Sequence, residues 1–287
     1  MLADAVDLLR CPHCAAPLSD TGGALRCPMG HGFDVARHGY VSLLPGDAET
    51  GTADTAAMLQ ARDAFLATGA YAPIADAVAA AAERSAAPEG CVLDLGGGTG
   101  YYLAAALERL EGRTGLALDL SKHASRRAAK VHPRAAAVVC DAWRPLPVRD
   151  GVAAVVLSVF SPRNPGEIAR VLDPAGGFVI VTPTDRHLGE LISLLGLLSV
   201  DERKRERLDD KLRSRFLLDE EVSVEYSMAL GHDAVGALVA MGPSAYHLDP
   251  VASAERIAAL ADPMPVTASV TVSAFRPVVS GDGGSAP

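Results

Sequence analysis

The chain has 287 residues, of which 49% are hydrophobic, and its formal net charge at pH 7 is −9. This length and apolar content suffice for one large core and a small second lobe. The acidic balance excludes a protein that coats nucleic acid non-specifically through Lys and Arg, so any RNA contact must come from a local patch.

The N-terminal residues and the positions of the cysteines indicate where in the cell the protein is found. The first residues, MLADAVDLLR, have no basic segment ahead of an apolar run, and no apolar stretch reaches the roughly 18 residues that a membrane span needs. Three of the five cysteines are crowded into residues 11–27, unlike the cysteines of a secreted disulfide scaffold. We therefore expect a cytoplasmic protein with no membrane partner.

Residues 11–31 carry a CxxC pair followed by a CxxxH pair, which comprise Cys11, Cys14, Cys27 and His31. Two knuckles of such ligands at this spacing predict a tetrahedral zinc site, whose closed coordination leaves no position for a substrate. The alternatives are disulfides or unused thiols, and His13 is a competing ligand. We assign the site to the folding of a zinc-binding ribbon over residues 1–45.

Residues 46–90 predict a linker and two helices. PGDAETGTAD, at 45–54, mixes turn formers with acids and has no periodicity. Asp54 is placed to cap a helix over residues 55–68, and Gly69 is placed to end it. A second helix is expected to begin near Pro73.

From residue 91 onward, short apolar runs alternate with helical segments. The runs are CVLDL, TGLALDL, AAVVC, AAVVLSVF and GFVIVTP. This alternation predicts an α/β domain over residues 91–287, built on a parallel sheet. We also expect a charged, solvated helix at 201–216 and a late edge strand at 266–277, VTASVTVSAFRP.

The stretch DLGGGTG, from Asp94 to Gly100, follows the first predicted strand and enters a helix. Glycines there let a ligand approach the backbone and the helix N–H groups. A dinucleotide fingerprint is excluded, because Tyr101 stands where its third glycine belongs. The spacing instead resembles the cofactor loop of Rossmann-like class I S-adenosylmethionine-dependent methyltransferases. That resemblance implies cofactor contacts from Asp94, Gly96, Gly98, Thr99 and Gly100.

Two further acids end the next two apolar runs. Asp119 follows the second run, where such folds hold a carboxylate for ribose hydroxyls. Asp141 follows the third, and the methyltransferase resemblance puts it and Ala142 beside the adenine. The alternative for each acid is that it only caps the helix after its strand.

The loops after the fourth and fifth strands are expected to face the substrate. Methyl transfer from a sulfonium is an in-line displacement that depends mainly on positioning. Phe160 could stack on a base, and Arg163 could contact a phosphate or a carbonyl. Ser161 lies between them, and His187 follows the fifth strand, where a packed or capping role is the alternative.

Several segments together resemble the bacterial 23S ribosomal RNA guanine-N1 methyltransferases. These are CPHCAAPL, FDVARHGYVSLL, AMLQARDAFLATGAYAPI, LDLGGGTGYYL and VFSPRNPGEIARVLDPAGG, in this order. The resemblance spans residues 8 to 275, and the zinc ribbon joined to this core makes it specific. GGGTG, FSPRNP and VAMGPSAYHLDP resemble the actinobacterial branch that confers resistance to tylosin. The other branch acts on a neighbouring guanine in the same hairpin near the peptide exit tunnel.

This resemblance implies an enzyme that moves a methyl group from S-adenosylmethionine to N1 of a guanine in 23S rRNA and confers resistance to tylosin-type macrolides. It implies zinc bound by the four knuckle residues, cofactor contacts from Tyr71 and His187, RNA recognition by the zinc lobe, and a homodimer. It supplies no general base, so the catalytic residues stay unknown beyond the candidates Phe160, Ser161 and Arg163.

Three questions stay open on the sequence alone. A small-molecule methyltransferase would keep the glycine loop but would have no evident use for a zinc ribbon. A non-catalytic rRNA-binding adaptor would not need an intact cofactor loop. The third concerns a run of cations without an acid from 121 to 140, which is either a solvated helix face or an RNA contact; it comprises Lys122, Arg126, Arg127, Lys130 and Arg134.

Overall fold

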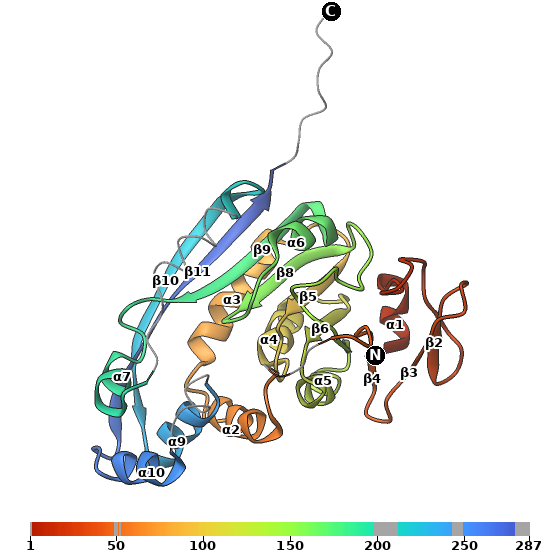
Figure 1. The fold of residues 1–287 in the computed structure, drawn as a ribbon. Coiled ribbons are helices and arrows are strands. Elements are labelled where there is room, and N and C mark those ends of the chain that lie inside the picture. Colours follow the sequence, from red (N-terminus) through yellow and green to blue (C-terminus); the bar gives the residue numbers. More distant parts are fainter. Residues whose placement is uncertain (1, 49–50, 52, 198–211, 243–248, 279–287) are drawn as a thin grey trace, which may run out of the picture.

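The computed structural model describes residues 2–48, 51, 53–197, 212–242 and 249–278 (Figure 1). Its centre is an eight-stranded sheet with the order β10-β11-β9-β8-β5-β6-β7-β4. The strands are β4 (Tyr40–Ser42), β5 (Cys91–Leu95), β6 (Gly115–Asp119), β7 (Ala135–Val139), β8 (Ala153–Val159), β9 (Leu172–Pro183), β10 (Phe216–Leu230) and β11 (Met264–Pro277).

The predicted parallel sheet is confirmed. The five apolar runs form β5 to β9, and each pairs in parallel with its neighbour, whereas β10 and β11 add an antiparallel hairpin beside β9. The α/β fold expected for residues 91–287 is therefore the fold observed. Because the carboxyl ends of parallel strands meet at one edge, the loops after β5, β6, β7 and β8 are neighbours.

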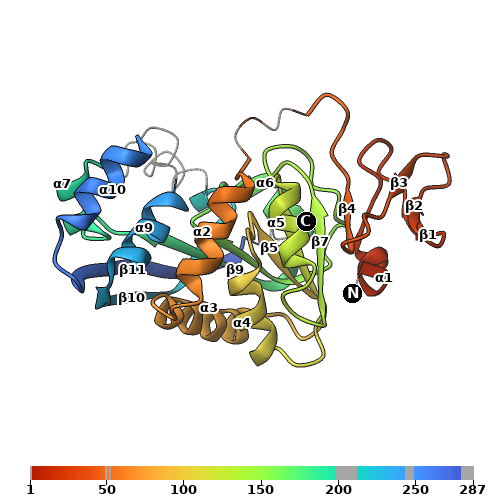
Figure 2. The same ribbon diagram turned by 90° about the horizontal axis from the view of Figure 1, so that it is seen from below.

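Helices cover the faces of the sheet, and others lie beyond the ends of its strands (Figures 1 and 2). They are α1 (Leu2–Ala5), the 3-10 turn η1 (Val6–Leu8), α2 (Ala56–Leu66), α3 (Ala72–Ser85), α4 (Tyr101–Arg109), α5 (Lys122–Ala128), α6 (Pro165–Val171), α7 (Gly189–Leu195), α9 (His232–Ala240) and α10 (Pro250–Ala258). No helix within the described ranges is long and apolar enough to cross a bilayer.

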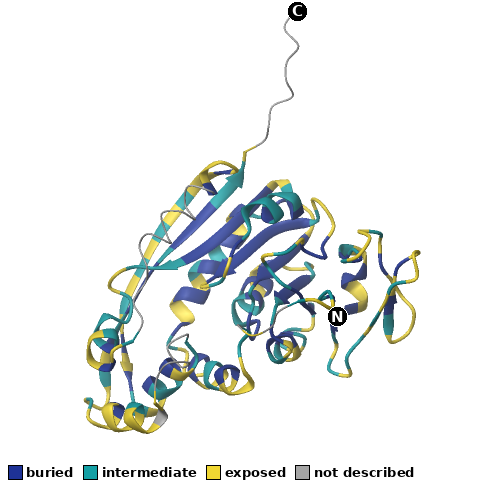
Figure 3. Ribbon diagram, in the orientation of Figure 1, coloured by how far each residue is buried: buried dark blue, intermediate teal, exposed yellow. Residues whose placement is uncertain are grey.

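Each face of the sheet carries its own core, and the central strands are buried on both sides (Figure 3). Alternate side chains of β5 belong to different cores: Val92 packs with α3 and α4, and Leu93 packs on the other side. This follows from the period of two in a strand. Fully buried parallel strands explain why their sequences are continuous apolar runs.

The N-terminal lobe is attached to this sheet. Its small antiparallel sheet consists of β1 (Ser19–Asp20), β2 (Ala24–Arg26) and β3 (Gly32–Asp34). Next along the chain, β4 pairs in parallel with β7, and buried Leu9 and Leu25 join the core that contains Leu93. The lobe and the large sheet thus share one hydrophobic core.

Three local predictions need correction. Thr55, not Asp54, caps α2, because its Oγ1 accepts a hydrogen bond from the Met58 N–H at 3.2 Å. The segment 266–277 is not an edge strand, since β11 lies between β10 and β9. The expected helix at 201–216 lies mostly outside the described residues, and its last position is wrong because Phe216 begins β10.

The packing of α3 on β9 yields the first testable prediction. A Cβ on Gly177 would meet the side chain of Ser85 and would lie 2.7 Å from its carbonyl oxygen. Gly177→Ala should therefore push α3 from the sheet and lower the free energy of unfolding by about 1–3 kcal/mol. Gly236→Ala is the matched control, because the space around this α9 glycine is open and alanine favours the helix. Denaturant unfolding of both variants decides, and equal stabilities would contradict the prediction.

Candidate active site and metal centre

The loop from Gly96 to Gly100 joins β5 to α4 and is fixed to the neighbouring strand. The N–H groups of Gly96 and Gly97 both donate to the Leu118 carbonyl, at 2.7 and 3.3 Å. Gly98 has φ +55°, and a Cβ there would lie 2.9 Å from Nη1 of Arg62. Only glycine combines this conformation with this approach. Of the other predicted loop residues, Thr99 is buried and Gly100 caps α4.

Two carboxyl groups lie at this loop. Asp119 accepts hydrogen bonds from the N–H groups of Gly98 at 2.9 Å and Ser121 at 2.8 Å. Asp94 is 1% exposed, and within the described part of the chain its Oδ2 has no hydrogen-bond partner. Burial, and then the charge of Asp119, raise the pKa of Asp94 to about 7. A buried acceptor without a donor marks a place for a ligand that carries donors or positive charge.

Arg62 of α2 closes this side of the site, and the sequence reading missed it. Its Nη1 pairs with Oδ2 of Asp54 at 2.6 Å, and its Nη2 donates to the Met241 carbonyl at 3.1 Å. The guanidinium therefore lies against Gly98 and ties α2 to the end of α9. A single arginine on a helix gives no local signal of such a role, because only the tertiary fold brings it to the loop.

Tyr71, Phe160 and His187 form a cluster next to the site. Tyr71 is buried, and its Oη lies 3.2 Å from Nε2 of His187. The Phe160 ring stacks on His187 with centroids 5.8 Å apart, and Phe160 remains 41% exposed. The three residues come from segments far apart in the sequence, and the structure brings them together.

The hydrogen bonds fix the tautomer of His187. The Ser269 N–H donates to its Nδ1 at 3.1 Å, so that nitrogen carries a lone pair. Burial lowers the pKa of His187 to about 4, which keeps the ring neutral with its hydrogen on Nε2. His187 therefore donates to the Tyr71 oxygen and leaves the tyrosine O–H free to donate elsewhere. Burial also raises the pKa of Tyr71, so its hydroxyl stays protonated.

The loop after β8 is held against the glycine loop. Ser161 Oγ donates to the Leu95 carbonyl at 2.5 Å and lies 2.9 Å from Ser158 Oγ. Phe160 adopts φ +52°, a strained conformation for an aromatic residue. Arg163 is only 8% exposed. The loop thus presents the Phe160 ring outward while Ser161 anchors it.

Asp141 and Ala142 follow β7 and are partly buried. Asp141 accepts a hydrogen bond from the Trp143 N–H at 2.9 Å. Burial, and then the charges of Asp119 and Asp141, raise the pKa of Cys140. Trp143 is 58% exposed at the same edge and was not singled out in the sequence.

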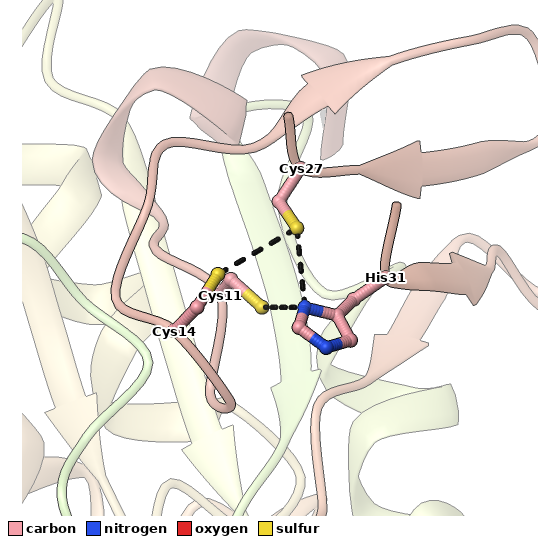
Figure 4. A group of neighbouring side chains, drawn as sticks. All are labelled: Cys11, Cys14, Cys27 and His31. Atoms are coloured by element: carbon pink, nitrogen blue, oxygen red, sulfur yellow. Dashed lines mark hydrogen bonds between the residues drawn. The ribbon is translucent and has the colours of Figure 1, made fainter. Parts of the chain in front are cut away.

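The four predicted zinc ligands converge in the N-terminal lobe (Figure 4). Nδ1 of His31 lies 3.3 Å from Cys27 Sγ and 3.5 Å from Cys11 Sγ, and Cys14 Sγ lies 3.7 Å from Cys27 Sγ. A tetrahedral zinc with sulfur ligands at about 2.3 Å has edges of about 3.7 Å, which these separations match. All four cysteine and histidine ligand atoms lie within 4.8 Å of one another.

The geometry disfavours both alternatives, namely disulfide bonds between the cysteines and His13 as a zinc ligand. All five cysteines are free. His13 lies outside the four-residue cluster. Its ring is tilted against that of His31, with centroids 5.0 Å apart, and stacks on Phe33 at 5.9 Å. Desolvation opposes ionisation of Cys27, but hydrogen bonds from His31 and Cys14 outweigh it and lower the pKa of this thiol to about 6. The cluster therefore suits a cation that binds thiolates.

Comparison with known proteins matches both lobes. Residues 9–49 match the zinc-ribbon family described as RlmA, N-terminal, and residues 92–176 match a methyltransferase domain. The 23S rRNA (guanine(748)-N(1))-methyltransferase of Streptomyces fradiae is 50% identical over 97% of this chain and 100% of its own. The chain belongs to the 23S rRNA (guanine-N1)-methyltransferase family. Putative members from Micromonospora griseorubida and Bacillus subtilis are 46% and 30% identical, over 97% and 83% of this chain and 100% and 87% of their own.

The cofactors of this methyltransferase are S-adenosylmethionine and zinc. The site fits S-adenosylmethionine, because the two carboxyl groups and the glycine loop suit a ligand that has a cationic amino-acid part and ribose hydroxyls. The two knuckles fit zinc, because their three thiols and one imidazole form a closed tetrahedral donor set.

Loss of one zinc ligand yields a prediction. Cys14 is exposed, so Cys14→Ser removes a ligand without opening a cavity. The purified methyltransferase variant should lose most of its zinc, because a structural site needs all four ligands. Cys140→Ala, a thiol outside the cluster, is the control and should retain one zinc per chain. Elemental mass spectrometry measures both, and full zinc in the serine variant would exclude Cys14 as a ligand.

The neutral state of His187 yields a pH prediction. Its folded pKa of about 4 lies below its ordinary value of 6.5, so between these pH values the unfolded chain binds more protons. Stability should therefore fall as pH decreases from about 6.5 to about 4, and His187→Gln should reduce that fall. Melting temperatures of both proteins across this window test it. Equal slopes in wild type and variant would show that His187 does not cause the loss.

Proposed function

We propose that this chain transfers a methyl group from S-adenosylmethionine to N1 of guanine 748 of 23S rRNA and so confers resistance to tylosin-type macrolides. The observation that carries the proposal is 50% identity to the Streptomyces fradiae methyltransferase across both lobes, with the glycine loop and its acids intact. A small-molecule methyltransferase would have no evident use for the zinc ribbon that family members share.

Within this proposal, the chain holds the cofactor from several sides. The backbone of Gly96–Gly100, including Thr99, approaches it, Asp94 and Asp119 accept hydrogen bonds from its amino group and ribose, and Asp141 and Ala142 flank its adenine. Tyr71 donates its free O–H, held in place by His187. When bound, S-adenosylmethionine supplies an activated methyl group on a sulfonium. The four cluster residues of the N-terminal lobe, from Cys11 to His31, hold zinc.

The acceptor guanine enters at the edge where Phe160 is exposed. The strained backbone of Phe160 and the anchoring bonds of Ser161 fix the ring in advance, so it can stack on a base without ordering cost. Arg163, in the same loop, is the candidate for a contact with a phosphate or a carbonyl of the RNA. His187 does not accept the guanine N1 proton, because its Nε2 hydrogen is committed to Tyr71. Orientation of the base is therefore the main contribution of this loop.

The proposal also covers the domain organisation, the oligomeric state and the cellular location. The zinc ribbon of residues 1–45 recognises RNA, residues 46–90 link it to the methyltransferase domain of residues 91–287, and two chains form a homodimer. Hydrophobic core shared between ribbon and sheet supports a rigid placement of the RNA-binding lobe. A 23S rRNA substrate supports a cytoplasmic location.

Primer extension on 23S rRNA tests the reaction. A methyl group on guanine N1 blocks the Watson–Crick edge and stops the polymerase. Incubation of the rRNA with purified protein and S-adenosylmethionine should produce a stop at guanine 748, and omission of the cofactor should abolish it. A stop at the neighbouring guanine would assign the chain to the other branch, and no stop despite cofactor binding would exclude the substrate.

A pair of glycine variants provides the control. Gly98→Arg should lose cofactor binding and the stop, because the side chain would fill the space at Arg62. Gly112→Arg makes the same chemical change at a glycine with φ +73° and no atom near its Cβ position. It should cost some stability and keep the stop. Methylation by Gly98→Arg at the wild-type rate would refute the position of the cofactor.

A further inference from the structure

The structure separates the five cations of the α5 segment into two groups. Arg127 pairs with Asp63 at 2.5 Å, and Arg134 donates to the carbonyls of Leu110 and Arg113 at 2.7 and 3.1 Å, so both stabilise the fold. The others, Lys122, Arg126 and Lys130, are exposed. They are four residues apart, which places them on one side of α5 and the turn after it.

The N-terminal lobe adds a fourth cation to this stripe. The turn between β3 and β4 packs on α5, since a Cβ on Gly39 would lie 3.9 Å from that of Ala129. Burial, and then the charges of Arg126, Arg37 and Lys130, lower the pKa of His38 in this turn. Cations from two lobes therefore surround one histidine, and both views show α5 next to the end of β4 (Figures 1 and 2).

These four cations lack the carboxylate partners that many arginines of this acidic chain have. Within the described residues they form no ion pair, whereas nine arginines pair with carboxylates: Arg10, Arg62, Arg84, Arg109, Arg127, Arg144, Arg170, Arg186 and Arg276. Like charges four apart on a helix destabilise it by a few tenths of a kcal/mol. The stripe therefore opposes folding slightly, which favours a role in binding.

We propose that Arg37, Lys122, Arg126 and Lys130 form a docking surface for the backbone phosphates of the rRNA substrate. The proposal rests on the proposed function. From Lys122 to Lys130 the stripe extends about 12 Å at the rise of a helix, enough to follow one strand across several phosphates. Since α5 begins three residues after Asp119, RNA bound to the stripe passes the edge of the sheet that holds the cofactor loop. Arg37 continues the contact onto the zinc lobe.

Two charge-matched double variants test the surface. R126Q/K130Q removes two cations of the stripe, and R84Q/R109Q removes two exposed cations that pair with Glu220 and Glu83 elsewhere. Affinity for a transcript of the 23S hairpin is measured at several salt concentrations, and S-adenosylmethionine binding by calorimetry. The stripe variant should bind RNA roughly tenfold more weakly and lose about 2 from the slope of log affinity against log salt. Its cofactor binding should equal that of the control.

The outcomes separate this surface from the reaction itself. If the stripe variant and the control have the same salt slope and RNA affinity, the docking surface is overturned. The surface is also overturned if the wild-type chain does not bind the hairpin. If wild type binds the hairpin with the full slope, the stripe variant loses it, and no methyl group is transferred, the surface stands and the proposed reaction fails.

Discussion

The conformation of the loop after β5 controls the rest of the site. Gly98 donates its N–H to Asp119, so the loop of one strand positions the acid of the next. Two side chains also contact the loop. Arg62 lies against Gly98, and Ser161 donates a hydrogen bond to the Leu95 carbonyl at the start of the loop. Three segments from distant parts of the sequence thus meet on a stretch that has almost no side chains. Glycine makes this convergence possible, because any larger residue would separate them.

The charges at this edge suit a cationic cofactor. Burial raises the pKa of both Asp94 and Asp119, which shows that folding keeps two acids where desolvation disfavours their ionised form. The neighbouring Tyr71 and His187 are neutral, so they do not neutralise those acids. Arg62 lies near Asp119, so Asp94 is the acid whose Oδ2 lacks a partner among the described residues and suits a positively charged ligand. The same arrangement serves mainly to position groups, as expected where displacement at an activated methyl group depends on orientation.

Local patterns explain what the sequence predicted. Strands β5 to β9 were predictable because buried parallel strands are continuous apolar runs, and the acids and glycines lie at fixed positions relative to them. The zinc knuckles were predictable because four ligands occur within 21 residues. By contrast, β10 alternates half-buried and exposed residues only from Glu220 onward, and its acidic first half hid the pattern. Arg62 and Ser269 gave no signal, because their partners at the site are brought to them only by the tertiary fold.

In an acidic protein that acts on RNA, some cations must remain unpaired with the protein's own carboxylates. In the described part of this chain, most arginines are engaged by carboxylates or carbonyls, so the exposed and unpaired ones mark where phosphates can compete. The zinc lobe has three arginines and four aspartates in its first 45 residues, too weak a charge to hold RNA alone. Pairing of β4 with β7 brings its Arg37 turn to α5. This pairing therefore brings cations of both lobes onto one surface that neither lobe could form separately.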